Sequence, residues 1–294
     1  MQQNFNDELH TMTLSEDGSY TAYSKEYDEH YHSTRDGALH ESLTKHVIPA
    51  LRMKQNEDEI NILDICFGLG FNTLATIYYA KKNNIKTKIN IYSPELDSDL
   101  VKSLKSFIYP KEFNEFKKLI LSLVENGFYD DEYLHIEIFL GDAREYILNF
   151  EDNKFEFVVS NGVIHHTSDP AKAFRELERV LKPRGTLFLG LYGKKGLLRY
   201  ATELTSLLLK RVPYKIIKNI LVKLKFSPLK RYYILDYIYV PIRKRFSEKE
   251  IKSLMNNFSD IELISDYPKG KINKFIYGTN YFYIIGKKHN KVYK

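Results

Sequence analysis

The sequence is poor in cysteine and has no long hydrophobic run. One cysteine, Cys66, among 294 residues excludes an intramolecular disulfide framework. We interpret Cys66 as a small apolar filler rather than a nucleophile. No stretch of about 18 uncharged apolar residues is present, so we expect no transmembrane segment. The first residues, Met-Gln-Gln-Asn-Phe, have neither a basic start nor an apolar stretch, so we expect a cytoplasmic rather than a secreted protein.

The charges are divided unequally along the chain. Residues 1–182 hold 20 basic against 31 acidic residues, a balance of −11, whereas residues 183–294 hold 24 against 7, a balance of +17. A basic region of this size favours an anionic partner, such as RNA, a phosphorylated metabolite or an acidic lipid surface. The alternative is a solvated lysine-rich face without a partner. The sequence gives no indication of the oligomeric state.

Strand patterns alternate with helix patterns over most of the chain. Strands are expected at 60–65, 88–93, 134–140, 155–160, 186–192, 260–265 and 281–285, the last two running antiparallel. Helices are expected at 37–53, 73–82, 113–126, 171–181 and 247–256, the last opened by a Ser247 and Glu250 capping box. This order predicts an α/β fold with a doubly wound, mostly parallel, seven-stranded, Rossmann-like sheet.

Two segments lie outside this alternation. Residues 1–55 form an extension in which the turn signal Glu16-Asp17-Gly18-Ser19 predicts a hairpin before the first helix. The main domain, 56–294, contains an insert at 196–245 that mixes leucine and isoleucine with lysine and arginine. We expect a basic, amphipathic, helical insert that acts as a lid, an RNA-facing patch or a membrane-surface element.

A glycine-containing turn follows the first strand of the main domain. The strand ends on Asp64, and Gly68 and Gly70 follow it at the start of the helix. Glycine permits a sharp turn and lets backbone amides approach a ligand, while the helix directs its positive end toward the same place. Thr73 stands where the dinucleotide fingerprint requires its third glycine, which argues against a nicotinamide-dependent oxidoreductase.

Polar residues stand at the ends of four predicted strands. They are Asp64, Glu95, Asp142 and Asn161. The carboxyl ends of parallel strands meet at one edge of the sheet, so these residues converge on one crevice. Glu95, with Asp97 as the alternative, is placed to accept hydrogen bonds from a ribose diol. Asp142 could accept from an adenine amino group while Ala143 leaves room for the ring.

Nine histidines are present, and their spacing fits no standard zinc pattern. We therefore predict no metal site. His165 and His166 follow the fourth strand, where a neutral imidazole could accept a proton or position a substrate. The alternative is that these histidines only cap or pack the loop before Asp169-Pro170.

The pattern Asp64-x-x-x-Gly68-x-Gly70 resembles the first motif of class I methyltransferases that use S-adenosyl-L-methionine (SAM). Residues 17–145 further resemble the family that completes 5-methylaminomethyl-2-thiouridine at the tRNA wobble position. The matching text lies at 17–19, 28–33, 37–42, 64–72, 92–97 and 141–144. This resemblance implies cofactor contacts from Asp64, Phe67, Gly68, Gly70, Asn72, Glu95, Asp142 and Ala143, and acceptor contacts from Tyr31 and His32.

Residues 155–290 resemble a second, broad group of methyltransferases that carry a His-His-Thr-x-Asp-Pro loop. The matching text lies at 160–170, 173–183 and 185–192. This resemblance implies catalytic positions at Asn161, His165 and His166, and an acceptor contact from Tyr192. In the tRNA-modifying family the fourth strand ends in Asp-Ala-Phe-Ser-Pro. Here it reads Val159-Ser160-Asn161-Gly162-Val163, and the two resemblances meet near 149–157.

These patterns predict a SAM-dependent methyltransferase whose acceptor is the aminomethyl group of a modified tRNA wobble uridine. A small-molecule or lipid acceptor is the alternative within the same chemistry, because the second group methylates such compounds. A non-catalytic SAM- or RNA-binding module is the alternative outside it, because the fourth-strand segment differs from that of the tRNA-modifying family.

Overall fold

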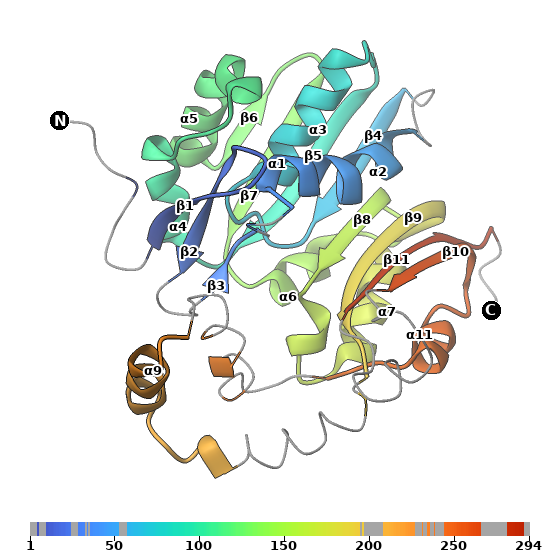
Figure 1. Ribbon diagram of the computed structural model, residues 1–294. Coiled ribbons are helices and arrows are strands. Elements are labelled where there is room, and N and C mark those ends of the chain that lie inside the picture. The colour runs from blue at the N-terminus through green and yellow to red at the C-terminus, as the bar shows by residue number, and fades with distance from the viewer. Residues whose placement is uncertain are drawn as a thin grey trace.

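The computed structural model in Figure 1 describes most of the chain. The described residues are 5, 10–24, 29–32, 34, 36–52, 58–194, 196, 208–226, 231, 234–235, 238, 244–265 and 281–290. Within them lie an eight-stranded sheet and a separate three-stranded antiparallel sheet. No helix among these residues is both long and apolar enough to cross a membrane.

The large sheet has the strand order β10-β11-β9-β8-β4-β5-β7-β6. Its strands are β4 (Glu59–Asp64), β5 (Lys88–Glu95), β6 (Phe128–Asp130), β7 (Leu134–Leu140), β8 (Phe155–Asn161), β9 (Leu181–Tyr192), β10 (Phe258–Ser265) and β11 (Tyr281–Lys288). β4, β5, β7, β8 and β9 are parallel, and β11 runs antiparallel to β9 and β10. The predicted doubly wound, mostly parallel sheet is confirmed.

The predicted number of seven strands is wrong by one. β6 adds a short edge strand antiparallel to β7. It begins directly after Gly127, whose φ of 78° turns the chain out of the preceding helix. Three residues are too few to show a strand period, so the sequence pattern did not reveal this strand.

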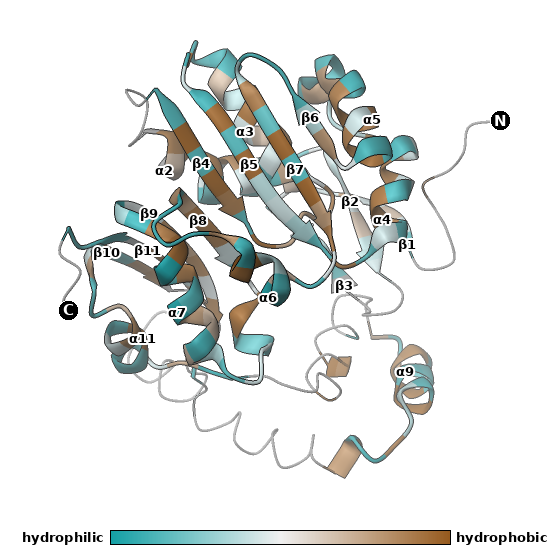
Figure 2. Cartoon of the chain, turned by 180° about the vertical axis from the view of Figure 1, so that it is seen from behind, coloured by the Kyte–Doolittle hydropathy of each residue, from teal (hydrophilic) through white to brown (hydrophobic). Residues whose placement is uncertain are grey.

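Helices cover both faces of the large sheet, as Figures 1 and 2 show from opposite sides. On the face in Figure 1 lie α1 (Ala38–Glu41), the π-helix η1 (Ser42–Val47), α2 (Ile48–Arg52) and α3 (Phe71–Lys82). Toward the β6 edge lie α4 (Ser98–Ser103), η2 (Leu104–Ser106), η3 (Lys111–Phe116) and α5 (Lys117–Asn126). The opposite face carries α6 (Ala143–Tyr146), η4 (Ile147–Asn149), η5 (Ile164–His166) and α7 (Pro170–Val180).

The alternation of side chains along the strands builds two cores. Ile62 and Val159 belong to the cluster under α3, whereas their neighbours Leu63 and Val158 belong to the cluster under α7. Successive strand residues point to opposite faces, so a sheet covered on both faces needs continuous apolar strands. The sequence supplies such strands in β4, β8 and β9.

The N-terminal residues form a layer on the same core. β1 (His10–Leu14) and β2 (Tyr20–Ser24) make the predicted hairpin, and β3 (Glu29–His30) extends it. In the turn, the Asp17 carboxylate accepts from the Ser19 amide and hydroxyl and from the His40 amide. Ala22 and Val47 belong to the cluster under α3, so this layer is built into the main core.

A lysine links the N-terminal layer to the last described strand. Lys45 of η1 lies 2.9 Å from an Asp36 carboxylate oxygen and 3.1 Å from a Glu41 carboxylate oxygen. Its ammonium also donates to the Tyr283 hydroxyl of β11 over 3.4 Å. These carboxylates outweigh burial and raise the pKa of Lys45. Segments about 240 residues apart are thereby held together.

Several predicted bounds need correction. The predicted helix 37–53 is divided into α1, η1 and α2 by the π-helical turn. Residues 182–185, which lie between the predicted helix 171–181 and the predicted strand 186–192, belong to β9 as a bulge, because Phe155 pairs with Leu181 while Phe157 pairs with Thr186. The capping box of α11 (Glu248–Leu254) is confirmed, with Ser247 and Glu250 bonding reciprocally.

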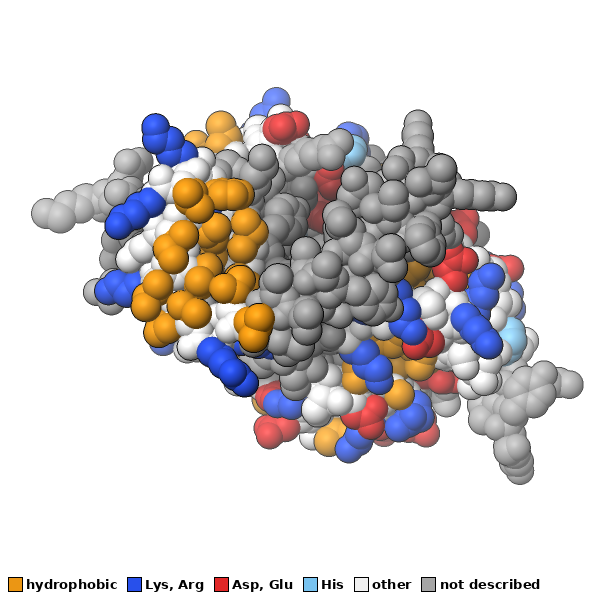
Figure 3. Space-filling view, turned by 60° about the horizontal axis from the view of Figure 1, so that its bottom comes forward, with side chains coloured by type: hydrophobic (Ala, Val, Ile, Leu, Met, Phe, Trp, Pro, Cys, Tyr) orange, Lys and Arg blue, Asp and Glu red, His pale blue; other side chains and the backbone are white. Residues whose placement is uncertain are grey.

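Of the 50 residues in the predicted insert at 196–245, 24 lie outside the described residues. The described part includes α9 (Tyr214–Lys223), which is amphipathic and basic as expected. Ile217 and Leu221 of α9 pack in a small cluster of their own with Leu235 and Ile238. Other apolar side chains of this region face solvent in Figure 3.

We predict that Phe71→Ala destabilises the fold by about 3–5 kcal/mol, the range for removing a buried ring. Phe71 is 0% exposed and packs within 6.2 Å, ring centre to ring centre, of Phe107, Phe113 and His32. Urea denaturation measures the loss. Leu148→Ala, at a side chain 62% exposed, is the control and should change the stability by less than about 0.5 kcal/mol. Equal effects of the two substitutions would contradict this account of the core.

Candidate active site

The loop between β4 and α3 has an unusual backbone. Cys66, Gly68 and Gly70 all adopt left-handed conformations, with φ of 74°, 56° and 74°. Two of the three positions are glycine, which adopts this conformation without strain. A Cβ at Gly70 would also lie 2.7 Å from the Phe67 ring. The loop therefore needs both glycines in order to turn directly into α3.

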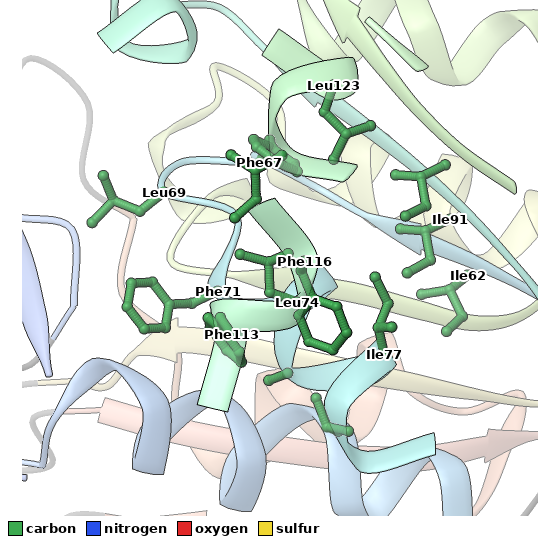
Figure 4. Close-up of a cluster of buried hydrophobic side chains, with 14 of the residues drawn as sticks. Ile62, Phe67, Leu69, Phe71, Leu74, Ile77, Ile91, Phe113, Phe116 and Leu123 are labelled. Atoms are coloured by element: carbon green, nitrogen blue, oxygen red, sulfur yellow. The ribbon is translucent and has the colours of Figure 1, made fainter. Parts of the chain in front are cut away.

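Apolar side chains anchor this loop from below. Phe67, Leu69 and Phe71 are 6%, 0% and 0% exposed and point into the cluster drawn in Figure 4. The Tyr109 hydroxyl donates to the Leu69 carbonyl over 2.8 Å. Because the Phe67 ring is in the core, any cofactor contact from Phe67 would come from its backbone.

Hydrogen bonds tie the loop to the strands on either side. The Ile65 amide donates to the Val159 carbonyl of β8, and the Phe67 amide donates to the Pro94 carbonyl of β5. The Gly68 amide donates to a Glu95 carboxylate oxygen over 2.8 Å. The other Glu95 oxygen accepts from the Asp97 amide over 2.9 Å. Glu95 is the last residue of β5 and lies beside the loop. The sequence predicts that this residue binds the ribose of the cofactor.

Asp64 lies behind the loop in a buried, polar environment. It is 3% exposed and accepts from the Asn72 side-chain amide over 3.2 Å. Burial raises the pKa of Asp64 to about 7, opposed by this hydrogen bond. With Asn72, Thr73 and His46, Asp64 lines a small cavity between η1, α3 and the sheet.

This cavity contains polar atoms that lack partners among the described residues. They are Asn72 Oδ1, Thr73 Oγ1 and His46 Nδ1. Burial lowers the pKa of His46 to about 3, so its imidazole is neutral at physiological pH. Buried polar groups of this kind are usually satisfied by ordered water. Asp64 and Asn72 thus support the loop from inside, away from its exposed rim.

The other predicted adenosine contacts lie at helix N-termini. Asp142 caps α6 by accepting from the Arg144 amide, and its carboxylate also pairs with the Arg144 guanidinium at 3.0 Å. Ala143 begins α6 beside it. Asp97, the alternative to Glu95, caps α4 by accepting from two backbone amides and lies 3.5 Å from the His10 ring. Asp97 therefore has a structural role, and Glu95 is the better placed of the two.

A second group of polar side chains gathers where β8 and β9 end and β11 begins. The Tyr281 hydroxyl donates to the Asn161 side-chain oxygen over 2.8 Å. Gly190 of β9 lies directly beneath this pair, and any Cβ there would overlap both side chains. The absence of a side chain at residue 190 therefore creates the room for the Asn161 and Tyr281 contact.

The two predicted histidines join this group. His165 is 0% exposed, and its ring centre lies 4.1 Å from that of Tyr192. His166 is partly exposed, with its ring 5.5 Å from the Tyr192 ring. Arg245 lies over the Tyr192 ring at 5.3 Å. Of the two histidines, His166 is the one that solvent or an acceptor can reach.

Tyr31 and His32 come from the N-terminal layer and lie beside the loop. A Cβ at Gly68 would lie 3.5 Å from the Tyr31 ring. The His32 ring packs 5.1 Å from that of Phe71 and lies 3.7 Å from a Glu41 carboxylate oxygen. The structure thus brings these predicted acceptor residues to the rim of the loop.

Three residues of these groups were missed by sequence reasoning. Tyr281 and Arg245 face the predicted histidine group, and Glu41 faces His32. For Tyr281 the signal was the alternation Tyr281-x-Tyr283 in the last strand, which places both rings on one face. No local signal pointed to Arg245 or Glu41, because their positions depend on tertiary packing. Among the described residues no group of three or more His, Cys, Asp or Glu could hold a metal ion.

Comparisons with known proteins agree with this fold. A family model described as a methyltransferase domain matches residues 117–189. The solved structure of MnmC2 from Aquifex aeolicus is similar, with 28% identity and a TM-score of 0.52. That match covers 68% of this chain and 65% of the MnmC2 chain.

Two curated proteins match shorter parts of the chain. An uncharacterised protein of Methanocaldococcus jannaschii is 29% identical over 168 residues, which cover 56% of this chain and 43% of that protein. Phosphoethanolamine N-methyltransferase 2 of Caenorhabditis elegans is 31% identical over 75 residues, covering 26% of this chain and 17% of that protein. The chain therefore spans less than half the length of these curated relatives.

The boundary near 149–157 between the two resemblances is not a structural boundary. The family model begins at residue 117 and ends at 189, so it spans that boundary. The match to MnmC2 covers more of the chain than residues 17–145 could supply. β8, which follows the boundary, pairs with β4 on one side and β9 on the other within one sheet.

We predict that Asp64 makes the stability depend on pH. The pKa of the folded carboxyl is about 7, whereas an aspartate exposed to water in the unfolded chain has a pKa of 3.8. The folded state therefore holds one more proton than the unfolded state between these values, and the free energy of unfolding falls by about 1.4 kcal/mol per pH unit as the pH rises. Asp64→Asn removes this dependence. Urea denaturation at pH 5 and pH 7.5 measures this. As the pH rises between these values, the parent should lose stability relative to Asp64→Asn, and an equal change in the free energy of unfolding of both proteins would contradict the prediction.

The topology, the glycine loop and the family model lead to the same conclusion. Five parallel strands with an antiparallel strand beside β9 place the loop at the carboxyl edge of the sheet. Polar side chains lie at the ends of three neighbouring strands at this edge, namely Asp64 of β4, Glu95 of β5 and Asn161 of β8. The chain contains a methyltransferase domain of class I, the class that uses SAM as its cofactor.

Proposed function

We propose that this protein transfers a methyl group from SAM to a nucleophilic acceptor. The observation that carries the proposal is the loop at 65–70, where Gly68 and Gly70 adopt left-handed conformations directly after β4 and the Glu95 carboxylate lies against the Gly68 amide. Carboxylate oxygens can each accept more than one hydrogen bond, so Glu95 can also bind a ribose diol. The turn presents no side chain at residues 68 and 70, which suits the close approach of a ligand.

The residues present fit SAM. Gly68 and Gly70 leave room for its methionine part, Glu95 can accept from ribose hydroxyls, and Asp142 with Ala143 lies at the neighbouring strand end. When bound, SAM supplies an activated methyl group on a positively charged sulfur. The protein holds the acceptor in line and excludes water, which lowers the barrier through alignment and desolvation.

The side chains around Asn161, with Tyr281 and the two histidines, would form the part of the site that binds the methyl acceptor. The Asn161 side-chain amide is held by Tyr281 and can orient a nucleophile by hydrogen bonding. His166 is partly exposed and can accept a proton from the acceptor near neutral pH. His165 is fully buried against Tyr192 and would position that ring rather than contact the acceptor.

We further propose the aminomethyl group of a modified tRNA wobble uridine as the acceptor. The similarity to MnmC2 supports this choice, as does the place of Tyr31 and His32 at the rim of the loop. The charge balance of +17 in residues 183–294 suits a polyanionic substrate.

A small-molecule or lipid acceptor is the second candidate. It is favoured by the match to a phosphoethanolamine N-methyltransferase and by the fourth strand, which ends in Asn161 instead of the aspartate of the tRNA-modifying family. The Asn161 side chain is neutral and already holds the Tyr281 hydroxyl, so it would orient an acceptor rather than remove its proton.

Cys66 gives a direct test of the cofactor site. It is the only cysteine and is exposed to solvent at the loop. Desolvation by surrounding atoms and the charges of Glu95, Asp64 and Asp142 raise the pKa of its thiol to about 12. We predict slow modification by a small neutral thiol reagent at pH 8.5 and a further slowing of at least about fivefold with saturating S-adenosylhomocysteine. Mass spectrometry of the intact protein measures both rates, and equal rates would place the cofactor elsewhere.

The activity is tested by methyl transfer from SAM carrying a labelled methyl group. Bulk tRNA lacking the terminal methylation is offered first, and a lipid and small-molecule extract second, with mass spectrometry of the products. Label in a wobble uridine supports the first acceptor, and label in the extract supports the second. Tight SAM binding by calorimetry with no product from either would indicate a non-catalytic module.

Two variants separate the sides of the site in this assay. Glu95→Gln should weaken SAM binding by about tenfold, since it removes a charged hydrogen-bond acceptor. Gly190→Ala should leave SAM affinity within about twofold, because it displaces only Asn161 and Tyr281, while product formation falls. If Gly190→Ala weakened SAM binding as much as Glu95→Gln, the assignment of Glu95 to the cofactor side and of Asn161 and Tyr281 to the acceptor side would be wrong.

A further inference from the structure

The described segment 208–226, which contains α9, has an unusual surface. Six of the 15 large apolar side chains that are exposed among the described residues lie within these 19 residues. They are Leu208, Ile216, Ile220, Val222, Leu224 and Phe226. Figure 3 shows an apolar patch of this kind, with Lys and Arg side chains beside it. Patches of this density usually mark an interaction site.

The exposed side chains form a line along α9. Ile216, Ile220 and Leu224 are spaced by four residues and are 49%, 46% and 63% exposed. The neighbouring line, Ile217 and Leu221, is 8% and 7% exposed and packs on Leu235 and Ile238. The apolar face of the helix is therefore wider than the surface that these packing partners cover. Half of this face remains available to a partner.

The charge of the segment restricts the identity of that partner. Residues 208–226 contain Lys210, Arg211, Lys215, Lys218, Lys223 and Lys225 and no acidic residue. The partner must accept aliphatic side chains and carry negative charge next to them. A bilayer with acidic headgroups has both properties at the required depth, because acyl chains lie directly below the phosphates.

We propose that the segment 208–226 docks this protein on an anionic lipid surface, with α9 lying in the plane of the interface. Ile216, Ile220 and Leu224 enter the boundary between headgroups and acyl chains, and Lys215 and Lys223 contact the headgroup phosphates. RNA fits less well, because it is bound through phosphate contacts and stacking on aromatic rings, which leaves an aliphatic stripe uncovered. This docking is independent of the acceptor that the methyltransferase site uses.

Vesicle sedimentation with the full chain tests the proposal. We expect binding to vesicles of phosphatidylcholine with 30% phosphatidylglycerol, and binding at least about tenfold weaker to pure phosphatidylcholine. Raising the salt from about 0.05 to 0.5 M should weaken the binding, since screening reduces the headgroup attraction.

Two variants divide the apolar and charged contributions. Ile216→Glu with Ile220→Glu should weaken binding at least about tenfold, because the two isoleucine side chains no longer insert into the bilayer. Lys215→Gln with Lys223→Gln alters only exposed side chains and should weaken binding about fivefold or more, and only to anionic vesicles. Leu148→Glu is the matched control, since Leu148 is 62% exposed at a distant surface, and should bind like the parent. Circular dichroism verifies the fold of each variant.

The remaining outcomes overturn the proposal. Absence of vesicle binding by the parent would do so, as would equal binding by the parent and both segment variants. Retention on tRNA that depends on this segment, without vesicle binding, would assign the surface to RNA. Concentration-dependent self-association abolished by Ile216→Glu with Ile220→Glu, again without vesicle binding, would assign it to a second copy of the chain.

Discussion

The hydrogen bond between the Gly68 amide and the Glu95 carboxylate determines the form of the candidate site. It joins the loop after β4 to the end of β5, and backbone bonds from Ile65 and Phe67 join the same loop to β8 and β5. A loop held on both sides keeps one conformation, in which Gly68 is partly exposed and Gly70 packs against the Phe67 ring. The buried rings of Phe67 and Phe71 then keep it from lifting away from the sheet.

The strands and the cofactor side could be predicted because their signals are local. A strand end, a polar residue directly after it and a glycine turn all lie within ten residues of one another, as at Asp64 to Gly70. Glu95 and Asn161 were found in the same way. Their convergence followed from the parallel order, which the alternation of strands and helices indicates.

The acceptor side could not be predicted to the same depth, because its contacts join distant parts of the chain. Tyr281 reaches Asn161 only if β11 pairs with β9 in one register, and a shift by one residue would turn Tyr281 to the other face. Glu41, the last residue of α1, meets His32 through the packing of α1 against the N-terminal layer, which no short sequence pattern indicates. The burial of the Phe67 ring could not be predicted either, because a motif records which residues occur and not which way they point.

The contact between Tyr281 and Asn161 also has a consequence for the order in which the molecule forms during synthesis. The loop, β4, β5 and Glu95 lie within the first hundred residues, and their local partners are made soon after them. Asn161 must wait for a residue 120 positions later before its side chain is fixed. All strands that hold the cofactor loop are therefore synthesised once β8 has been made, whereas the acceptor side can become complete only when β11 has emerged and paired.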